Sequence, residues 1–134
     1  MKNTILGIHQ LPLAYLKDPI LLEELIYANM QKNYYWSEDF SPEYYIAQAK
    51  AGFIAVTDQY EEEELLLPEI QFSYAVLDFK DLHVSKKIKR LLTKNPLSLE
   101  ITQELDPVLS HIRASHENCW LTPSYIKMLN ETKG

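Results

Sequence analysis

The chain has 134 residues, 46% of them hydrophobic, and a formal net charge of −6. This length allows one ordinary hydrophobic core and excludes two independent domains of typical size, so we expect a single domain over residues 1–134. A pI near 5.2 excludes indiscriminate binding to nucleic acid, because the acidic remainder would repel a phosphate backbone everywhere except at a local basic patch.

The cysteine content and the apolar patterning indicate a reducing compartment. The single cysteine, Cys119, cannot form an internal disulfide, and residues 1–10 lack the apolar stretch and cleavage site of a secretory signal. No apolar run approaches the ~20 residues that span a bilayer. We therefore expect a cytoplasmic protein with no membrane partner.

Four of the seven prolines follow a residue that can cap a helix, which predicts four helix starts. The pairs are Asp18-Pro19, Ser41-Pro42, Asp106-Pro107 and Thr122-Pro123. Asp, Ser and Thr side chains accept hydrogen bonds from the free N–H groups of a first turn, and proline suits the first helical position. Apolar residues at helical spacing follow each pair, which supports a helix after each of them.

Three short runs rich in aromatic or branched residues lie between these helices and predict strands. They are residues 53–57, 71–77 and 97–101. The acidic run at residues 61–64 is expected to be a solvated loop, because like charges repel one another. Strands that cluster among helices without a repeating β-α-β order favour an α+β fold, with about five short helices on a small, mainly antiparallel sheet.

The run from Lys86 to Lys94 holds five of the thirteen lysines and arginines of the chain. Ser85 occupies an N-cap position and Asn95-Pro96 ends the run, so we expect a fifth helix here. At 100° per residue, the cations fall on one side of this helix and the apolar residues on the other. The cations are Lys86, Lys87, Lys89, Arg90 and Lys94, and the apolar residues are Val84, Ile88, Leu91 and Leu92.

This arrangement predicts a helix that docks its apolar side on a core and presents its basic side to an anionic partner such as phosphate. The alternative is an ordinary solvated face, since Lys and Arg are the usual outward residues of an amphipathic helix.

Two other groups of residues could carry chemistry. Tyr34-Tyr35-Trp36 and Tyr44-Tyr45 could stack on bases, although such residues more often pack in a core. His111, His116 and Cys119 lie close in sequence, but a structural zinc site needs four ligands in defined pairs. No Ser-His-Asp order or Cys-His signature indicates nucleophilic catalysis. We therefore expect no metal, no cofactor and no catalytic residue in this chain.

Several short segments, taken together, have a distinctive order and spacing along the chain. Around the basic helix they are Ala75-Val76-Leu77, Leu82-His83-Val84-Ser85-Lys86, Leu99-Glu100-Ile101-Thr102 and Trp120-Leu121-Thr122. Upstream lie Asp39-Phe40-Ser41-Pro42-Glu43 and Ala51-Gly52-Phe53. From about residue 35 to its end, the chain resembles the N-terminal part of the leucyl/phenylalanyl-tRNA-protein transferases. The upstream pair is similar to that family's Gly-Asp-Leu-Ser-Pro stretch and to the end of its following helix.

Members of that family transfer leucine or phenylalanine from aminoacyl-tRNA to the N-terminus of an acceptor protein with a basic first residue, within N-end rule protein catabolism. The resemblance implies that Lys86, Arg90 and Lys94, with Lys87 and Lys89 beside them, contact the backbone of the tRNA acceptor stem. It places Trp120 in the substrate pocket. The co-substrate is aminoacyl-tRNA, and the catalytic groups are expected in an acetyltransferase-like domain beyond this chain, into which residues 120–134 would lead.

Two segments depart from the family pattern and leave other functions open. Ile54-Ala55-Val56-Thr57 stands where the family has Phe-Pro-Trp-Phe, and Pro68-Glu69-Ile70-Gln71 stands where it has Trp-Trp-Ser-Pro. Both changes remove aromatic surface from the expected pocket. The alternatives to a transferase are a stand-alone module that binds tRNA or other RNA, and a non-catalytic interaction domain.

Overall fold

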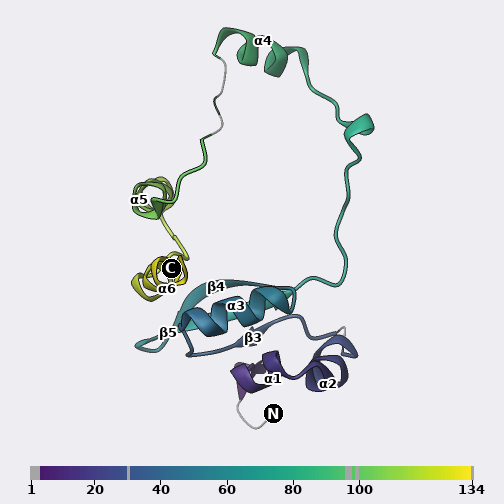
Figure 1. Ribbon diagram of the computed structural model, residues 1–134, viewed down its shortest axis with the longest axis vertical. Helices are drawn as coiled ribbons and strands as arrows, with labels where there is room; N and C mark the ends of the chain where they lie inside the picture. Colours follow the sequence, from purple (N-terminus) through teal and green to yellow (C-terminus); the bar gives the residue numbers. More distant parts are fainter. Residues whose placement is uncertain (1–3, 30, 96–97, 99, 134) are drawn as a thin grey trace. The chain divides into compact units, whose positions relative to one another are not determined.

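The computed structural model describes residues 4–29, 31–95, 98 and 100–133 (Figure 1). The chain divides into two compact units, and each is described by itself below. The first unit is Met1–Phe72 with Glu104–Gly134, and the second is Ser73–Gln103. The expectation of one domain over the whole chain stays a prediction.

The first unit begins with a hairpin of two short strands, β1 (Thr4–Ile5) and β2 (Ile8–Gln10). Two residues join them, Leu6 at a φ of 50° and Gly7 at 83°, and positive φ at both positions is the mark of a type I′ turn. The sequence patterning did not predict this hairpin, because each strand is too short to show an alternation.

Two consecutive helical segments follow this hairpin. Helix α1 is Leu13–Lys17, and α2 (Pro19–Leu21) continues without a break into the π-helical segment η1, Leu22–Tyr27. The carboxylate of Asp18 accepts a hydrogen bond from the backbone N–H of Ile20 at 2.9 Å. The helix predicted after Pro19 is therefore confirmed, with the predicted cap.

The next part of the first unit alternates a short strand, a helix and a long hairpin. Its elements are β3 (Tyr35–Trp36), α3 (Pro42–Lys50), β4 (Phe53–Tyr60) and β5 (Glu63–Ile70). Strands β4 and β5 pair antiparallel, β1 and β2 also pair antiparallel, and β2 and β3 pair parallel. The fold is α+β with a small, mainly antiparallel sheet, as predicted.

Strand β5 connects the two groups of strands. The backbone N–H groups of Leu66 and Ile70 donate to the carbonyl oxygens of Ser37 (2.8 Å) and Asn33 (2.9 Å). Between them Pro68 has no N–H to donate, which helps to explain why the contact between β3 and β5 stays at isolated bridges.

The prediction of a solvated loop over residues 61–64 is wrong in its second half. Glu61 and Glu62 form the turn between β4 and β5, whereas Glu63 and Glu64 already belong to β5. The pairing with β4, which sequence patterning does not show, draws these two residues into the strand. Pro68 is a second reason why the sequence does not predict β5, because proline is unusual in the interior of a strand.

The C-terminal helices are α5 (Leu105–Ser115) and α6 (Pro123–Thr132). The hydroxyl of Thr122 accepts from the N–H of Tyr125 at 3.4 Å, and the hydroxyl of Ser41 accepts from the N–H of Tyr44 at 3.2 Å, so both predicted caps are confirmed. Helix α5 exists as predicted but begins earlier. Its cap position is Glu104, and Asp106 lies in the first turn.

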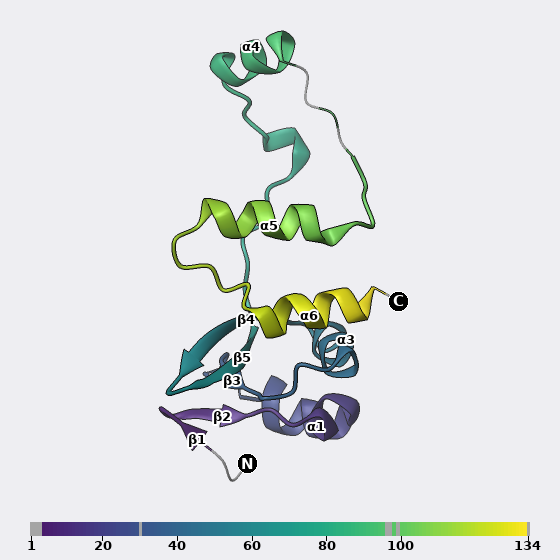
Figure 2. The same ribbon diagram turned by 90° about the vertical axis from the view of Figure 1, so that its left-hand side faces the viewer.

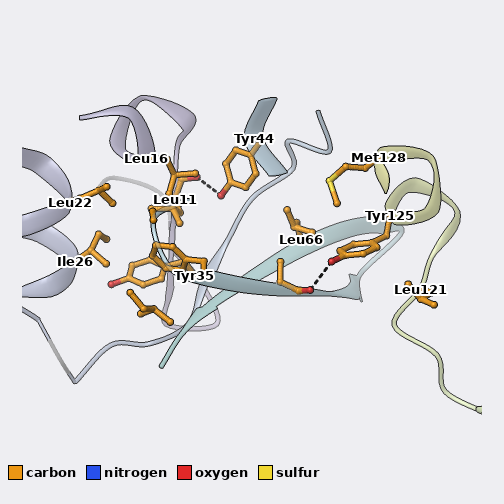
Figure 3. Packing of buried hydrophobic residues seen from close by; sticks show 14 of the residues in the cluster. Leu11, Leu16, Leu22, Ile26, Tyr35, Tyr44, Leu66, Leu121, Tyr125 and Met128 are labelled. Atoms are coloured by element: carbon orange, nitrogen blue, oxygen red, sulfur yellow. Dashed lines mark hydrogen bonds between the residues drawn. The ribbon is translucent and has the colours of Figure 1, made fainter. Parts of the chain in front are cut away.

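One part of the core lies between the β4–β5 hairpin and two helices, α3 and α6, which contact each other with crossed axes (Figure 2). Helix α1 and the segment η1 add Leu16, Leu22 and Ile26 to the same cluster. Alternate residues of the hairpin face α3 and α6, and the cross-strand pairs Phe53–Ile70, Ala55–Pro68 and Thr57–Leu66 are all buried. Two tyrosine hydroxyls tie the layers together (Figure 3): Tyr125 donates to the carbonyl of Ala55 at 3.1 Å, and Tyr44 donates to that of Leu11 at 2.8 Å.

The second unit contains a short 3-10 helix, η2 (Phe79–Asp81), and the helix α4 (Lys86–Lys94). The strand predicted at residues 71–77 is wrong: these residues form no strand, and the side chains of Tyr74 and Val76 are each 81% exposed. A run of β-forming residues becomes a strand only where another strand pairs with it. Of the strand predicted at 97–101, residues 98, 100 and 101 are not in a strand, and 97 and 99 lie outside the described residues.

Among the residues described, the chain forms six α-helices rather than five. The five helices predicted from caps and periodicity are present, and α1 is the additional one. None of the described helices is both long and apolar enough to cross a membrane.

Candidate nucleic-acid interface

Helix α4 forms for local reasons. The hydroxyl of Ser85 accepts from the backbone N–H of Ile88 at 3.3 Å, which caps the first turn as predicted. At the other end, the N–H of Asn95 donates to the carbonyl of Leu91 at 2.9 Å. No residue of α4 is buried, so only its cap and its helix-forming residues support it, and a helix of this length without a core is marginally stable in water.

The basic side of α4 is exposed along its whole length. All five predicted cations, Lys86, Lys87, Lys89, Arg90 and Lys94, are classed as exposed. Within the described ranges, the ion pairs are Lys17–Glu43, Lys80–Asp78 and Lys127–Glu131, and none of them involves an α4 cation. The structure thus brings together five cations that no carboxylate of the described chain neutralises by direct contact.

The charge of the chain is segregated between its two units. The second unit has six lysines and arginines against three aspartates and glutamates, whereas the rest of the chain has seven against sixteen. An anion that approaches the second unit therefore meets a local excess of positive charge, despite the acidic total.

The prediction that α4 docks its apolar side on a core is wrong for the residues described, because this side is not buried. The side chains of Ile88, Leu91 and Leu92 are 45%, 53% and 41% exposed. A shallow groove of about 220 Å³ runs where the two sides of the helix meet, and it places Lys87, Arg90 and Lys94 next to Ile88 and Leu91. Apolar contact and positive charge are available at the same spot.

Trp120, the predicted pocket residue, lies in the first unit at the rim of a polar pocket of about 410 Å³. Its indole is 44% exposed and stacks edge-on against Tyr125, with ring centroids 5.1 Å apart and planes at 89°. Its backbone carbonyl accepts a hydrogen bond from the hydroxyl of Thr57. These contacts hold the backbone and one edge of the ring while part of the indole stays open.

Two acidic residues, Asp58 and Glu117, line the pocket beside Trp120. Carboxylates repel phosphate, so this pocket suits an uncharged or cationic part of a ligand. Sequence reasoning did not find either residue. Asp58 comes from β4 and Glu117 from the segment after α5, and no local pattern connects two residues so far apart in sequence.

Comparison with protein-family models, with curated proteins and with solved structures finds no match. The resemblance to the leucyl/phenylalanyl-tRNA-protein transferases therefore stays a prediction that depends on the quoted sequence segments. The geometry of α4 and of the Trp120 pocket is the independent basis for a function.

The other candidates from the sequence have mainly structural positions. Tyr35, Trp36 and Tyr44 are at most 4% exposed, so they pack in the interior and offer no open ring for a base, whereas Tyr34 is 45% exposed. His116 Nδ1 lies 3.0 Å from the backbone carbonyl of Ile112. Across the described residues, no three His, Cys, Asp or Glu side chains are arranged to hold a metal ion.

Proposed function

We propose that this chain binds the phosphate backbone of a tRNA acceptor stem through the basic side of α4, as the tRNA-contacting part of an aminoacyltransferase of the Leu/Phe class. The observation that supports this proposal best is the set of five exposed cations within nine residues of one helix, none of which pairs with a carboxylate of the described residues. The family resemblance supplies the identity of the RNA and of the reaction.

The physical basis is the release of counterions. Each phosphate that a lysine or arginine neutralises frees condensed cations, so affinity falls steeply as salt rises. Double-stranded RNA is recognised mostly through its shape and backbone, because its deep groove hides the bases. A short basic helix with no buried residue fits this kind of contact, which needs charge and access rather than a shaped pocket.

The transferase part of the proposal places the aminoacyl end of the tRNA at Trp120. In such a reaction the amine nitrogen of the acceptor forms a bond to the ester carbonyl carbon. The bond to the tRNA 3′-oxygen breaks, and a proton passes from the amine to the leaving oxygen. Asp58 and Glu117 disfavour phosphate and tolerate an ammonium group, which matches an aminoacyl ester better than a nucleotide backbone. The groups that move the proton are expected in an acetyltransferase-like domain.

The alternative, a module that binds RNA without catalysis, uses the same helix. It differs in one respect: its affinity does not depend on whether the tRNA is charged. A non-catalytic interaction domain would show no salt-dependent tRNA binding at all.

The test is a filter-binding titration of tRNA against the variant Lys86→Glu/Arg90→Glu at several salt concentrations. We expect weaker binding, and a salt slope that is less steep by about two, since each lost phosphate contact removes about one. The matched control is Lys50→Glu/Lys133→Glu, which changes the net charge equally but leaves α4 intact. Equal affinity and slope for the α4 variant and the unaltered chain would refute the assignment of this surface.

A further inference from the structure

The second unit has no core among its described residues. Between residues 73 and 103, none of the described residues is buried, and only Val84 is half-buried. The described chain has seventeen exposed large hydrophobic residues, and nine of them lie within the 31 residues of this unit. Exposed apolar surface at this density marks a site of interaction.

Contact with RNA would use only part of α4. A phosphate backbone pairs with the cations and does not cover an aliphatic side chain. The exposed side chains of Ile88, Leu91 and Leu92 would therefore remain in water. The apolar surface continues before the helix, where Phe79 is 92% exposed and Leu82 is 52% exposed. The apolar side of α4 thus calls for a partner of different chemistry.

Cations lie along both borders of this apolar side. At 3.6 residues per turn, Lys87 lies about 40° from Leu91 on one border, and Lys89 lies about 60° from Leu92 on the other. The groove on α4 also has Lys87 next to Leu91. Long basic side chains in such positions lay their methylene groups along apolar surface and keep their charged ends in a polar layer. Residues 82–99 contain no aspartate or glutamate, so the matching partner is both apolar and anionic.

We propose that the apolar side of α4 inserts into the surface of a bilayer that contains anionic phospholipids, with its cations among the phosphate headgroups. This surface matches both sides of the helix at once, because acyl chains contact the aliphatic residues and headgroups contact the cations. The α4 helix of a second copy is a poorer partner, since it would bring like charges together.

This interaction needs no membrane-spanning segment. The expectation of no membrane partner depended on the lack of an apolar run that could cross a bilayer, and a helix that lies in the surface does not require one. Contact along one whole side also supports a nine-residue helix that is marginally stable in water. We therefore expect the helical content of α4 to rise on the bilayer.

The experiment is co-sedimentation of the full chain with vesicles of phosphatidylcholine, either alone or mixed with phosphatidylglycerol. We expect binding to the anionic vesicles and not to the neutral ones. The variant Lys86→Glu/Arg90→Glu should bind the anionic vesicles more weakly, by about fivefold or more for each cation removed. Cα chemical shifts of residues 86–94 with anionic vesicles measure the gain of helix.

The variant Ile88→Gln/Leu91→Gln tests the apolar side separately. Glutamine keeps the helix propensity and the charge but resists burial in lipid, so we expect vesicle binding to weaken about tenfold or more. The matched control is Ile20→Gln/Ile54→Gln, which makes the same change at positions of the first unit that are 66% and 74% exposed. Both variants should bind tRNA as the unaltered chain does, because their cations are intact.

Three outcomes would overturn the proposal: no binding to anionic vesicles, equal binding to neutral ones, or equal vesicle affinity of the α4 apolar variant and its control. An oligomer that forms without lipid and is lost in Ile88→Gln/Leu91→Gln would also overturn it, because the apolar side would then belong to a second copy. The proposal does not depend on RNA binding. Vesicle binding without tRNA binding would refute the proposed function and support this one, and the reverse result would do the opposite.

Discussion

Buried tyrosine hydroxyls form hydrogen bonds between parts of the first unit that are far apart in sequence. The Tyr125 hydroxyl is the clearest case, because it satisfies the carbonyl of Ala55 on β4 from helix α6. Tyr44 does the same for Leu11, and burial raises the pKa of both tyrosines. The sequence could not assign these bonds, since the partners are 70 and 33 residues apart.

We expect Tyr125→Phe to lower the free energy of unfolding by about 1–2 kcal/mol, because the carbonyl of Ala55 then lacks its partner. The pH dependence gives a second signature. Burial raises the pKa of Tyr125 from its ordinary value of 10.0 to about 12. The contribution of its neutral hydroxyl is therefore complete below pH 10.0 and lost as the pH rises to about 12.

Urea denaturation at several alkaline pH values measures both effects. The variant should lose less stability than the unaltered chain between pH 10 and about pH 12. Identical pH profiles for the two proteins would show that the Tyr125 hydroxyl is not protected by folding.

Gln48 presents the opposite situation. Its side chain is 1% exposed in α3, and its Oε1 atom has no hydrogen-bond partner within the residues described. Gln48→Met replaces the amide with an apolar group of similar length, so we expect the free energy of unfolding to rise by about 1 kcal/mol. Gln103→Met, at an exposed position, is the matched control and should leave the stability unchanged. Destabilisation by Gln48→Met would indicate that the amide makes a contact that matters.

At the scale of elements, five of the six α-helices in the described residues were predictable and most of the strands were not. Ser41, Ser85 and Thr122 mark helix starts by bonds to residues three positions later, so their signal is contained in a few letters. A strand depends on a partner that can be far away. Only β4 was found, and residues 71–77 have strand-forming side chains without a paired strand.

The N-caps of α3 and α4 should differ in their effect on stability, because α3 contributes buried residues and α4 does not. We expect Ser41→Ala to lower the midpoint of global unfolding, since α3 contributes the buried residues Tyr44 and Gln48. Ser85→Ala removes a cap that stabilises α4 by about 1 kcal/mol, so we expect the helical content of α4 to fall. The midpoint of global unfolding should stay unchanged, because α4 buries no residue.

Cα chemical shifts along residues 86–94 measure the helical content, and thermal denaturation measures the midpoint. A fall of the midpoint in Ser85→Ala equal to that in Ser41→Ala would mean that α4 is coupled to the core of the first unit.

At the scale of the whole molecule, the basic side of α4 belongs to the second unit and the pocket beside Trp120 belongs to the first. The sequence located the basic side of α4 correctly, because a helical periodicity and a run of cations are local features. It named Trp120 through the resemblance alone, and it missed the carboxylates Asp58 and Glu117 beside it, which only folding brings together. Each feature can therefore be altered without touching the other.

This separation gives the test that distinguishes a transferase part from a simple RNA-binding module. We compare the affinities of leucyl-tRNA and uncharged tRNA for the unaltered chain, for Trp120→Ala and for Lys86→Glu/Arg90→Glu. In a transferase part, the unaltered chain prefers the charged tRNA, and Trp120→Ala removes this preference while it keeps the salt slope. The α4 variant loses affinity for both tRNAs because the lost contacts are to the backbone. Equal affinity of the unaltered chain for both tRNAs, with the slope intact, would leave RNA binding as the function and remove Trp120 from the site.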